Sequence, residues 1–168
     1  ILLLIHRIMK VSFRKGLGFG VTSGVITTLG MMVGLDASTH SWLVVVAGIV
    51  LIAVGDSLSD AFSIHVSEEF EARHNPREIW EATITTFVSK FVFTMTFLIP
   101  LLLLPLSEAI IAGIVWGVLL ITVFNYYVAL QEKISAYKVI GEHLLIAAAV
   151  IIATHYIGEL LASMANSL

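Results

Sequence analysis

Cysteine is absent from the sequence, and charged residues and proline are scarce. Without cysteine the chain has no disulfide framework, no thiolate metal site and no thiol nucleophile. Charged residues make up 12% of the chain and hydrophobic residues 58%, with a mean hydropathy of +1.00. A soluble domain has about half apolar residues and about a quarter charged ones. The composition therefore indicates an integral membrane protein, with the lipid bilayer as its surroundings and no nucleic-acid partner.

Long apolar runs dominate the chain, and five of them are long enough to cross a bilayer, which takes about 20 helical residues. They cover about residues 17–35, 42–64, 83–104, 109–130 and 140–162. We therefore expect an all-α polytopic protein with one transmembrane domain over residues 1–168. Pro100 and Pro105 are expected to kink and end the third span. Residues 1–15 are too short for a span and predict an interfacial amphipathic helix, with a frayed end as the alternative.

Basic residues gather on one side of the predicted membrane. The nine lysines and arginines are Arg7, Lys10, Arg14, Lys15, Arg73, Arg77, Lys90, Lys133 and Lys138. They precede the first span, surround the second loop or lie in the fourth loop. The positive-inside rule then places the N-terminus in the cytoplasm and the C-terminus outside or in a lumen. The membrane is the cell membrane in a prokaryote or an organelle membrane in a eukaryote.

Two aspartates interrupt the second span, one helical turn apart. On a 3.6-residue period they share one face with hydroxyl side chains, and the whole stripe is Asp56, Ser59, Asp60, Ser63 and Ser67. A charged side chain near the bilayer centre costs several kcal/mol, so it normally faces a partner, a bound ion or water. The stripe predicts a cation site. In the alternative, the aspartates are protonated or hydrogen-bonded and serve only helix packing.

Glycines four residues apart form a ridge on the first span: Gly16, Gly20 and Gly24, then Gly30 and Gly34. Such small residues let membrane helices approach closely. Ser23, Thr27 and Met31 fall near the same face. One interpretation is that the ridge brings these three side chains up to the aspartates and forms half of a polar pathway. Simple helix packing is the other interpretation.

Lys90 lies inside the third span, close to its predicted cytoplasmic end. The expected behaviour is snorkelling of its ammonium to the membrane surface. The alternative is pairing with Asp60, which the predicted topology places at a similar depth. Pairing would hold Asp60 ionised and would make Lys90 a regulator of cation occupancy.

Acidic residues continue the second helix beyond the membrane. His65, Glu68, Glu69 and Glu71 lie there, and Glu81 could meet them across the turn and complete a metal-holding cluster. Solvated charge is the alternative for this group. The segment Asn75-Pro76-Arg77-Glu78 predicts a helix start with a capping box, so capping also accounts for acidic residues in this region. His155 and Glu159, one turn apart in the fifth span, could bind a metal or pass protons, or simply be solvated.

The order and spacing of several short motifs resemble the vacuolar iron transporter family, which includes plant and yeast importers of iron and manganese. The motifs are the glycine-rich run 20–34, Ala47-Gly48 with Gly55, Thr86-Phe87 with Pro100, and the segment 156–160. The resemblance implies a five-helix homodimer whose pathway lies at the subunit interface between first and second helices. It also implies exchange of divalent cations for protons.

This sequence departs from the family pattern at three places. The intramembrane aspartate of the first helix falls at Ser23, and the methionine of the second helix falls at Ser59 in ungapped register. Asp56 and Asp60 are then expected to take over the charge. The Glu-rich cytoplasmic module of iron-storing members is reduced to about residues 68–81. Hard oxygen ligands without a thioether suit manganese, magnesium or calcium at least as well as Fe²⁺.

The leading hypothesis is a proton-coupled transporter of divalent metal cations such as Fe²⁺ or Mn²⁺, and not an enzyme. Its predicted metal-binding side chains are Asp56, Asp60, Ser59, Ser23, Thr27, Met31, Ser63, Glu68, Glu69 and Glu81. An alternative is a non-transporting membrane scaffold or partner subunit in which the polar stripe mediates association. A third hypothesis is a membrane alcohol phosphotransferase, but the upstream Asp-Gly and Arg elements of that chemistry are not found in the sequence.

Overall fold

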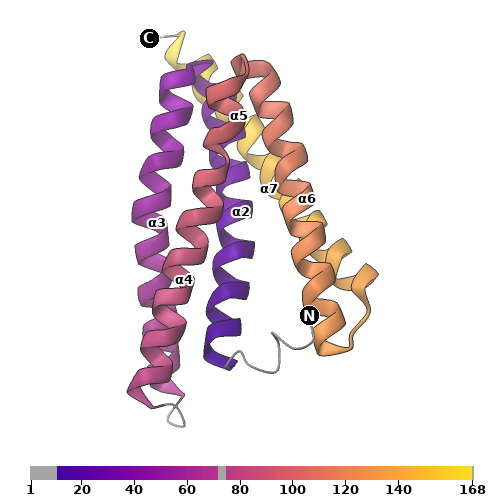
Figure 1. Cartoon of the computed structure of the whole chain (residues 1–168). Helices are drawn as coiled ribbons and strands as arrows, with labels where there is room; N and C mark the ends of the chain where they lie inside the picture. Colours follow the sequence, from indigo (N-terminus) through magenta and orange to yellow (C-terminus); the bar gives the residue numbers. More distant parts are fainter. Residues whose placement is uncertain (1–10, 72–74, 168) are drawn as a thin grey trace.

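Six helices and no strand make up the part of the chain that the computed structural model describes, residues 11–71 and 75–167 (Figure 1). They are α2 (Val11–Thr39), α3 (Trp42–Phe70), α4 (Pro76–Thr96), α5 (Leu98–Leu103), α6 (Leu106–Glu132) and α7 (Ala136–Ala165). With α4 and α5 taken as one span, five segments are long and apolar enough to cross a membrane. The predicted all-α, multi-pass membrane fold is confirmed.

The boundaries of the first span differ from the prediction. Residues 11–15, assigned to an interfacial helix, are the first turns of the continuous helix α2. Residues 1–10 of that predicted helix lie outside the described residues. The start of α2 and the end of α7 lie at opposite ends of the bundle (Figure 1), as an odd number of spans requires. We call these ends the Lys15 end and the His40 end, after residues near each.

Capping and proline chemistry set the limits of α4 and α5. Asn75 Oδ1 accepts from the Glu78 backbone N–H at 3.1 Å, and Glu78 reaches back to the Asn75 N–H, so the predicted capping box is confirmed. At the other end Pro100 has no N–H to donate to the carbonyl four residues earlier, and α4 stops at Thr96. Pro105 likewise leaves the Leu101 carbonyl free, and the Trp42 indole donates to it at 2.7 Å.

The central helix α2 touches α3, α4, α6 and α7, and its glycines decide two of these contacts. An added Cβ at Gly20 would lie 2.7 Å from the Thr86 carbonyl oxygen of α4, and one at Gly30 would lie 2.7 Å from Val150 of α7. The predicted close approach is therefore confirmed. Its partners are α4 and α7, whereas the sequence interpretation aimed the ridge at the aspartates of α3.

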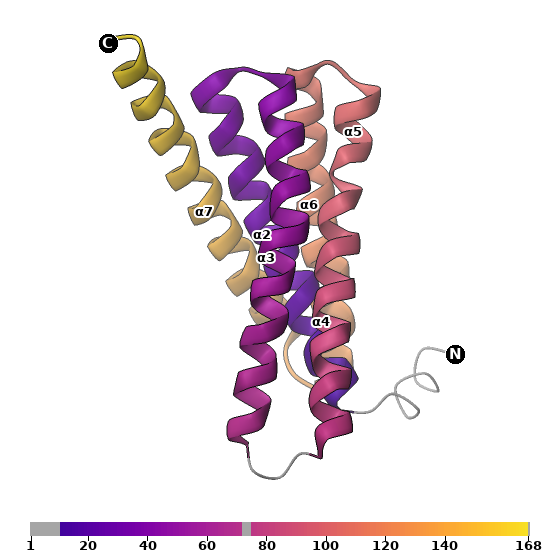
Figure 2. The ribbon, with the colours of Figure 1, turned by 90° about the vertical axis from the view of Figure 1, so that its left-hand side faces the viewer.

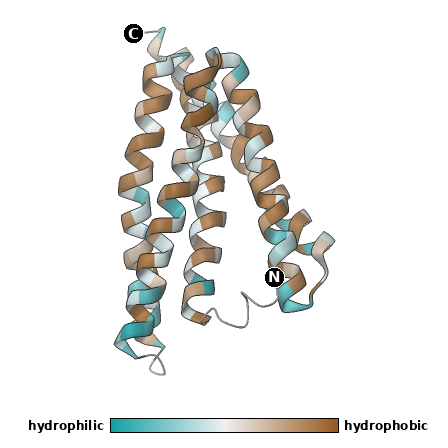
Figure 3. Cartoon of the chain, in the orientation of Figure 1, coloured by the Kyte–Doolittle hydropathy of each residue, from teal (hydrophilic) through white to brown (hydrophobic). Residues whose placement is uncertain are grey.

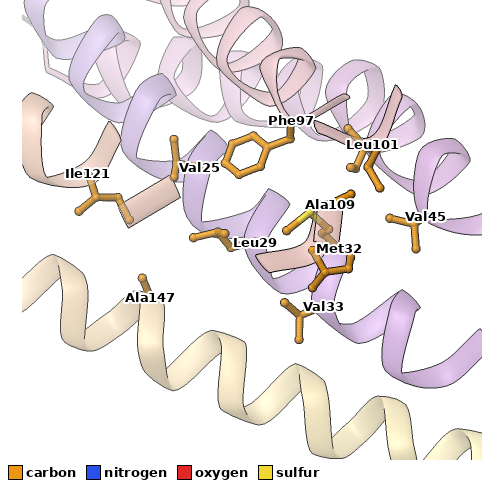
Figure 4. Packing of buried hydrophobic residues seen from close by; sticks show 12 residues of the cluster. Val25, Leu29, Met32, Val33, Val45, Phe97, Leu101, Ala109, Ile121 and Ala147 are labelled. Carbon is orange, nitrogen blue, oxygen red and sulfur yellow. The ribbon is translucent and has the colours of Figure 1, made fainter. Parts of the chain in front are cut away.

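Buried apolar side chains fill the space between α2, α5 and α6, toward the His40 end (Figure 4). The cluster is Val25, Leu29, Met32, Val33, Val45, Ile49, Phe97, Leu101, Ala109, Ile110, Ile121 and Ala147. The glycines of α6 receive side chains of α2, since a Cβ at Gly113 or Gly117 would collide with Met32 or Leu29. This apolar core packs α6 against α2, and Arg14 of α2 also forms an ion pair with Glu132 at the Lys15 end of α6.

The last helix, α7, diverges from the rest of the bundle toward its C-terminal end (Figure 2). Most of its surface is exposed in the single chain, and its buried residues are Ala147 and Gly158. Figure 3 shows that hydrophobic residues dominate the helices and that hydrophilic residues gather at the Lys15 end of the bundle, in α3, α4 and α6. Such apolar exposed faces are suited to contact with acyl chains.

Candidate functional site

The strongest concentration of charge inside the bundle lies where α2, α3 and α4 meet. Asp56 has as many residues of α3 before it as after it, and Lys90 lies near the midpoint of residues 76–103. At 1.5 Å per residue, the middle of a helix of this length is roughly 20 Å from either end. These side chains therefore lie near the middle of their helices, far from both ends of the bundle, and charge inside the apolar part of a bilayer is costly.

The Lys90 ammonium is the centre of this cluster, and only 1% of its side chain is exposed. Its Nζ lies 2.5 Å from Asp56 Oδ2 and also forms an ion pair with Asp60 Oδ2. One helical turn separates the two aspartates, so a single ammonium reaches both carboxylates. The expected snorkelling of Lys90 is wrong, because its ammonium is buried between the helices and paired with carboxylates. The alternative, pairing with Asp60, is what the structure contains, and Asp56 shares the ammonium.

Helix α2 joins the cluster through Ser23. Its hydroxyl donates to Asp60 Oδ2 at 2.7 Å and accepts from Lys90 Nζ at 3.0 Å. The next residue, Gly24, leaves room for the lysine stem, since an added Cβ there would lie 3.1 Å from Lys90 Cγ. The glycine ridge therefore serves the site indirectly: it brings α4 close enough for Lys90 to reach Ser23 and the aspartates.

Formal charges in the cluster do not cancel. Two carboxylates face one ammonium, which leaves one negative charge when all three groups are ionised. The carboxylates are also less enclosed than the lysine, with 34% of the Asp56 side chain and 19% of the Asp60 side chain exposed. A proton or an external cation can neutralise the remaining charge from this open side. Carboxylate and hydroxyl oxygens are the ligands that hard cations prefer.

The other predicted residues of the stripe lie apart from the ammonium. Thr27 donates its hydroxyl to the Ser23 carbonyl of its own helix at 2.9 Å. Met31 lines a groove of about 360 Å³ between α2 and α7. Ser59 and Ser63 are exposed on the outer side of α3, and Ser63 donates to the Ser59 carbonyl at 2.9 Å. Of the predicted intramembrane ligands, the fold brings together Asp56, Asp60 and Ser23.

The predicted metal-holding cluster at the Lys15 end is not formed. Glu68 is buried and pairs with Lys15 at 3.0 Å, whereas Glu69 is exposed and lies 3.5 Å from His65. Within residues 11–71 and 75–167, no three His, Asp or Glu side chains are close enough to hold one metal ion, and Glu81 is therefore part of no such group. The physical reason is helix geometry, because consecutive residues 68 and 69 point to different faces of α3.

His155 and Glu159 form a half-exposed pair on α7, 3.4 Å apart. No third ligand joins them among the described residues. Of the two interpretations of this pair, the solvated one fits its exposure.

Sequence reasoning overlooked a polar stripe on α4. Thr83, Thr86, Lys90 and Thr94 are three or four residues apart, and all are buried. This spacing was visible in the sequence and predicts one helix face. Thr94 accepts from the Thr28 hydroxyl of α2 at 3.2 Å, and Thr83 contacts His65 of α3 at 2.9 Å. The stripe thus contacts both neighbouring helices of the site.

A second overlooked group is the Ser57 hydroxyl beside Asp56. It is fully buried, and it has no hydrogen-bond partner among the described residues. A buried hydroxyl without a partner costs free energy. Ser57 directly follows the ion-paired Asp56, so this part of α3 carries a buried hydroxyl as well as a carboxylate.

No model of a known protein family matches the chain, and no curated protein matches it significantly. The resemblance to vacuolar iron transporters therefore stays a prediction.

Proposed function

We propose that this membrane protein moves divalent cations across the bilayer in exchange for protons, with Asp56 and Asp60 as the ligands that alternate between the two. The observation that carries the proposal is a pair of partly exposed carboxylates at mid-span, with one more negative charge than the ammonium beside them neutralises. Metal ligands must be deprotonated, so a cation and a proton compete for the same carboxylate. Exchange follows from that competition.

Position supports transport over a purely structural role. Intramembrane carboxylates are costly and mark ion pathways more often than they mark packing. Ser23 supplies a third oxygen from a different helix, so a cation at this place would be held by two helices. Motion of α2 against α3 would then change the ligand set, which is a physical route to releasing the cation.

The resemblance to the iron and manganese importers supports Mn²⁺ or Fe²⁺ as substrate and a homodimer as the assembly. In such a dimer the second copy would cover the open side of the aspartates on α3. Exposed apolar residues of α3 fit burial by a helix or by lipid, among them Leu51, Leu58 and Phe62. Both the ion and the dimer are parts of this proposal.

The test is uptake of Mn²⁺ into liposomes that contain the purified protein. We expect Asp56→Asn and Asp60→Asn each to reduce uptake at least about tenfold, because each removes half of the charge that holds the cation. Glu108→Gln, an exposed acid at the start of α6, is the matched control and should transport at the wild-type rate. Wild-type rates in both aspartate variants would refute the proposal.

A non-transporting scaffold is the second candidate, and one observation favours it. Lys90 already pairs with both carboxylates, so the cluster can act as a cross-link between α3 and α4. A scaffold does not bind the cation, so the cation does not change its stability. A transporter binds Mn²⁺ in its folded state and is stabilised by it. The melting temperature of the wild type with and without Mn²⁺ separates the two, since only cation binding raises it.

A further inference from the structure

A cavity of about 400 Å³ lies between α2 and α7, on the Lys15 side of the groove that Met31 lines. Its lining residues are Gly18, Phe19, Thr22 and Ser23 of α2 and His143 of α7. The Ser23 hydroxyl also donates to Asp60 Oδ2 at 2.7 Å and accepts from Lys90 Nζ at 3.0 Å. One side chain therefore belongs both to the wall of this cavity and to the charged cluster.

A second cavity, of about 280 Å³, adjoins the first one toward the Lys15 end of the bundle. Gly18 lines both cavities, and the second is also lined by Arg14 and Lys15 of α2 and by Glu132 of α6. A Cβ added at Gly18 would meet nothing within 4 Å, so this glycine leaves the junction between the cavities open. Together the two cavities extend from the charged Lys15 end to Ser23.

His143 is held in an orientation that is typical of a metal ligand. Its Nδ1 lies 2.8 Å from the Val139 carbonyl oxygen, and because a carbonyl only accepts hydrogen bonds, Nδ1 carries the hydrogen. Nε2 is then the nitrogen that a metal ion can bind, and metal-binding histidines commonly donate their other N–H in this way. The other histidines that the structure describes lie 3.4 to 3.9 Å from a carboxylate oxygen, and they are His40, His65 and His155.

From this geometry we propose that the two cavities are the route by which the transported cation reaches Asp60 from the Lys15 end, and that His143 Nε2 binds the ion on the way. The inference rests on the proposed function and adds an entrance and a nitrogen ligand to it. Thr22 and Ser23 supply hydroxyl oxygens in the same cavity. One imidazole and two hydroxyls hold a hydrated ion weakly, which suits a place of passage, since conduction requires binding that is weak enough to leave.

The imidazole also makes the entrance selective among divalent cations. The oxygens of Asp56, Asp60 and Ser23 suit Mg²⁺, Ca²⁺ and Mn²⁺, whereas an imidazole nitrogen suits Fe²⁺ better than any of these three. His143 therefore acts as a specificity-determining residue that favours Fe²⁺.

The first experiment tests the route, and it uses the absence of cysteine from the sequence, which gives an introduced thiol no background. Gly18→Cys is treated with a methanethiosulfonate reagent that carries a permanent trimethylammonium group and does not enter lipid. We expect the thiol to react and the attached charge to lower Mn²⁺ uptake into liposomes at least about tenfold, because a fixed positive charge beside the route repels the cation. Val115→Cys, on the exposed apolar surface of α6, is the control and should not react. An unreactive thiol in Gly18→Cys, or a modified one with unchanged uptake, would overturn the inference.

The second experiment compares the uptake of Fe²⁺ with that of Mn²⁺. His143→Gln should lower Fe²⁺ uptake about tenfold, since loss of a ligand costs at least as much as loss of its hydrogen-bond partner. Mn²⁺ uptake should fall less, because Mn²⁺ binds nitrogen more weakly. The ratio of the two uptakes does not depend on how much of the variant is folded. His155→Gln, the other histidine of α7, should keep the wild-type ratio. A wild-type ratio in His143→Gln counts against the inference as decisively as an unreactive thiol.

Failure of this inference can be told apart from failure of the proposed function. Wild-type uptake of Mn²⁺ combined with an unreactive thiol in Gly18→Cys removes only the route, and Asp56 and Asp60 remain the cation site. Absence of Mn²⁺ and Fe²⁺ uptake in the wild type removes the transporter, and the inference with it, even where the thiol of Gly18→Cys reacts.

Discussion

The two halves of the bundle differ in what they bury. Helix α2 buries 12 of its 29 residues, whereas the 30 residues of α7 include two buried ones, Ala147 and Gly158. Among the described residues, buried polar side chains lie in α2, α3 and α4, apart from Asn125 of α6, which bonds its own helix at Ile121. Close packing and polar chemistry thus occur together on the α2–α4 side. Helices α6 and α7 expose mostly apolar side chains on the outside of the bundle.

The largest effect is expected from removing the charge partners of Lys90. The double change Asp56→Asn with Asp60→Asn leaves a buried ammonium without a carboxylate, which should lower the free energy of unfolding by about 3–5 kcal/mol. Glu159→Gln breaks the half-exposed ion pair of α7 and should change the free energy of unfolding by less than about 1 kcal/mol. Unfolding of both variants in mixed micelles measures these changes. Similar losses in the two variants would contradict the difference between the halves.

A smaller effect is expected from the glycine contact between α2 and α4. Gly20→Ala places a methyl group 2.7 Å from the Thr86 carbonyl oxygen, and overpacking of this kind costs about 1–3 kcal/mol. Gly18 is the matched control on the same helix, because nothing lies within 4 Å of an added Cβ there. The melting temperatures of Gly20→Ala and Gly18→Ala measure this difference. A melting temperature of Gly20→Ala equal to that of Gly18→Ala would show that α4 can move away from α2 freely.

The smallest effect concerns the helix starts of the two halves. Asn75 caps α4 through its side chain, whereas Ser135, at the same position of α7, makes no side-chain capping bond. Asn75→Ala should therefore cost about 1 kcal/mol, and Ser135→Ala should cost almost nothing. The readout is again unfolding in mixed micelles. An effect of Ser135→Ala as large as that of Asn75→Ala would mean that capping does not distinguish these helices.

Much of this fold was predictable because local rules decide it. Apolar run lengths gave the five spans, Asn75 and Glu78 gave the start of α4, and Pro100 gave the break before α5. One of the two interpretations of the glycine spacing placed Ser23, Thr27 and Met31 beside the aspartates, and the structure places Ser23 there. The helices that pack against the glycine ridge could not be predicted. The spacing shows that the helix approaches another helix closely, but it does not show which one.

The role of Lys90 could be stated only as an alternative before the structure was known. Snorkelling depends on depth, and the predicted third span began near Thr83, which placed Lys90 close to the surface. In the structure α2 and α3 place Ser23, Asp56 and Asp60 around its ammonium, so the side chain is buried and pairs inside the bundle. The cluster of Glu68, Glu69 and Glu81 failed for another reason, since helix phase separates Glu68 from Glu69.

The most direct test of the account is equilibrium binding of Mn²⁺ to the purified protein, with the wild type compared with Asp60→Asn. The account predicts saturable binding by the wild type and affinity weakened at least about tenfold in the variant, because the carboxylate shared by Lys90 and Ser23 is lost. Glu159→Gln should bind like the wild type. Equal affinity in wild type and Asp60→Asn would contradict the claim that the carboxylates of α3 form a cation site.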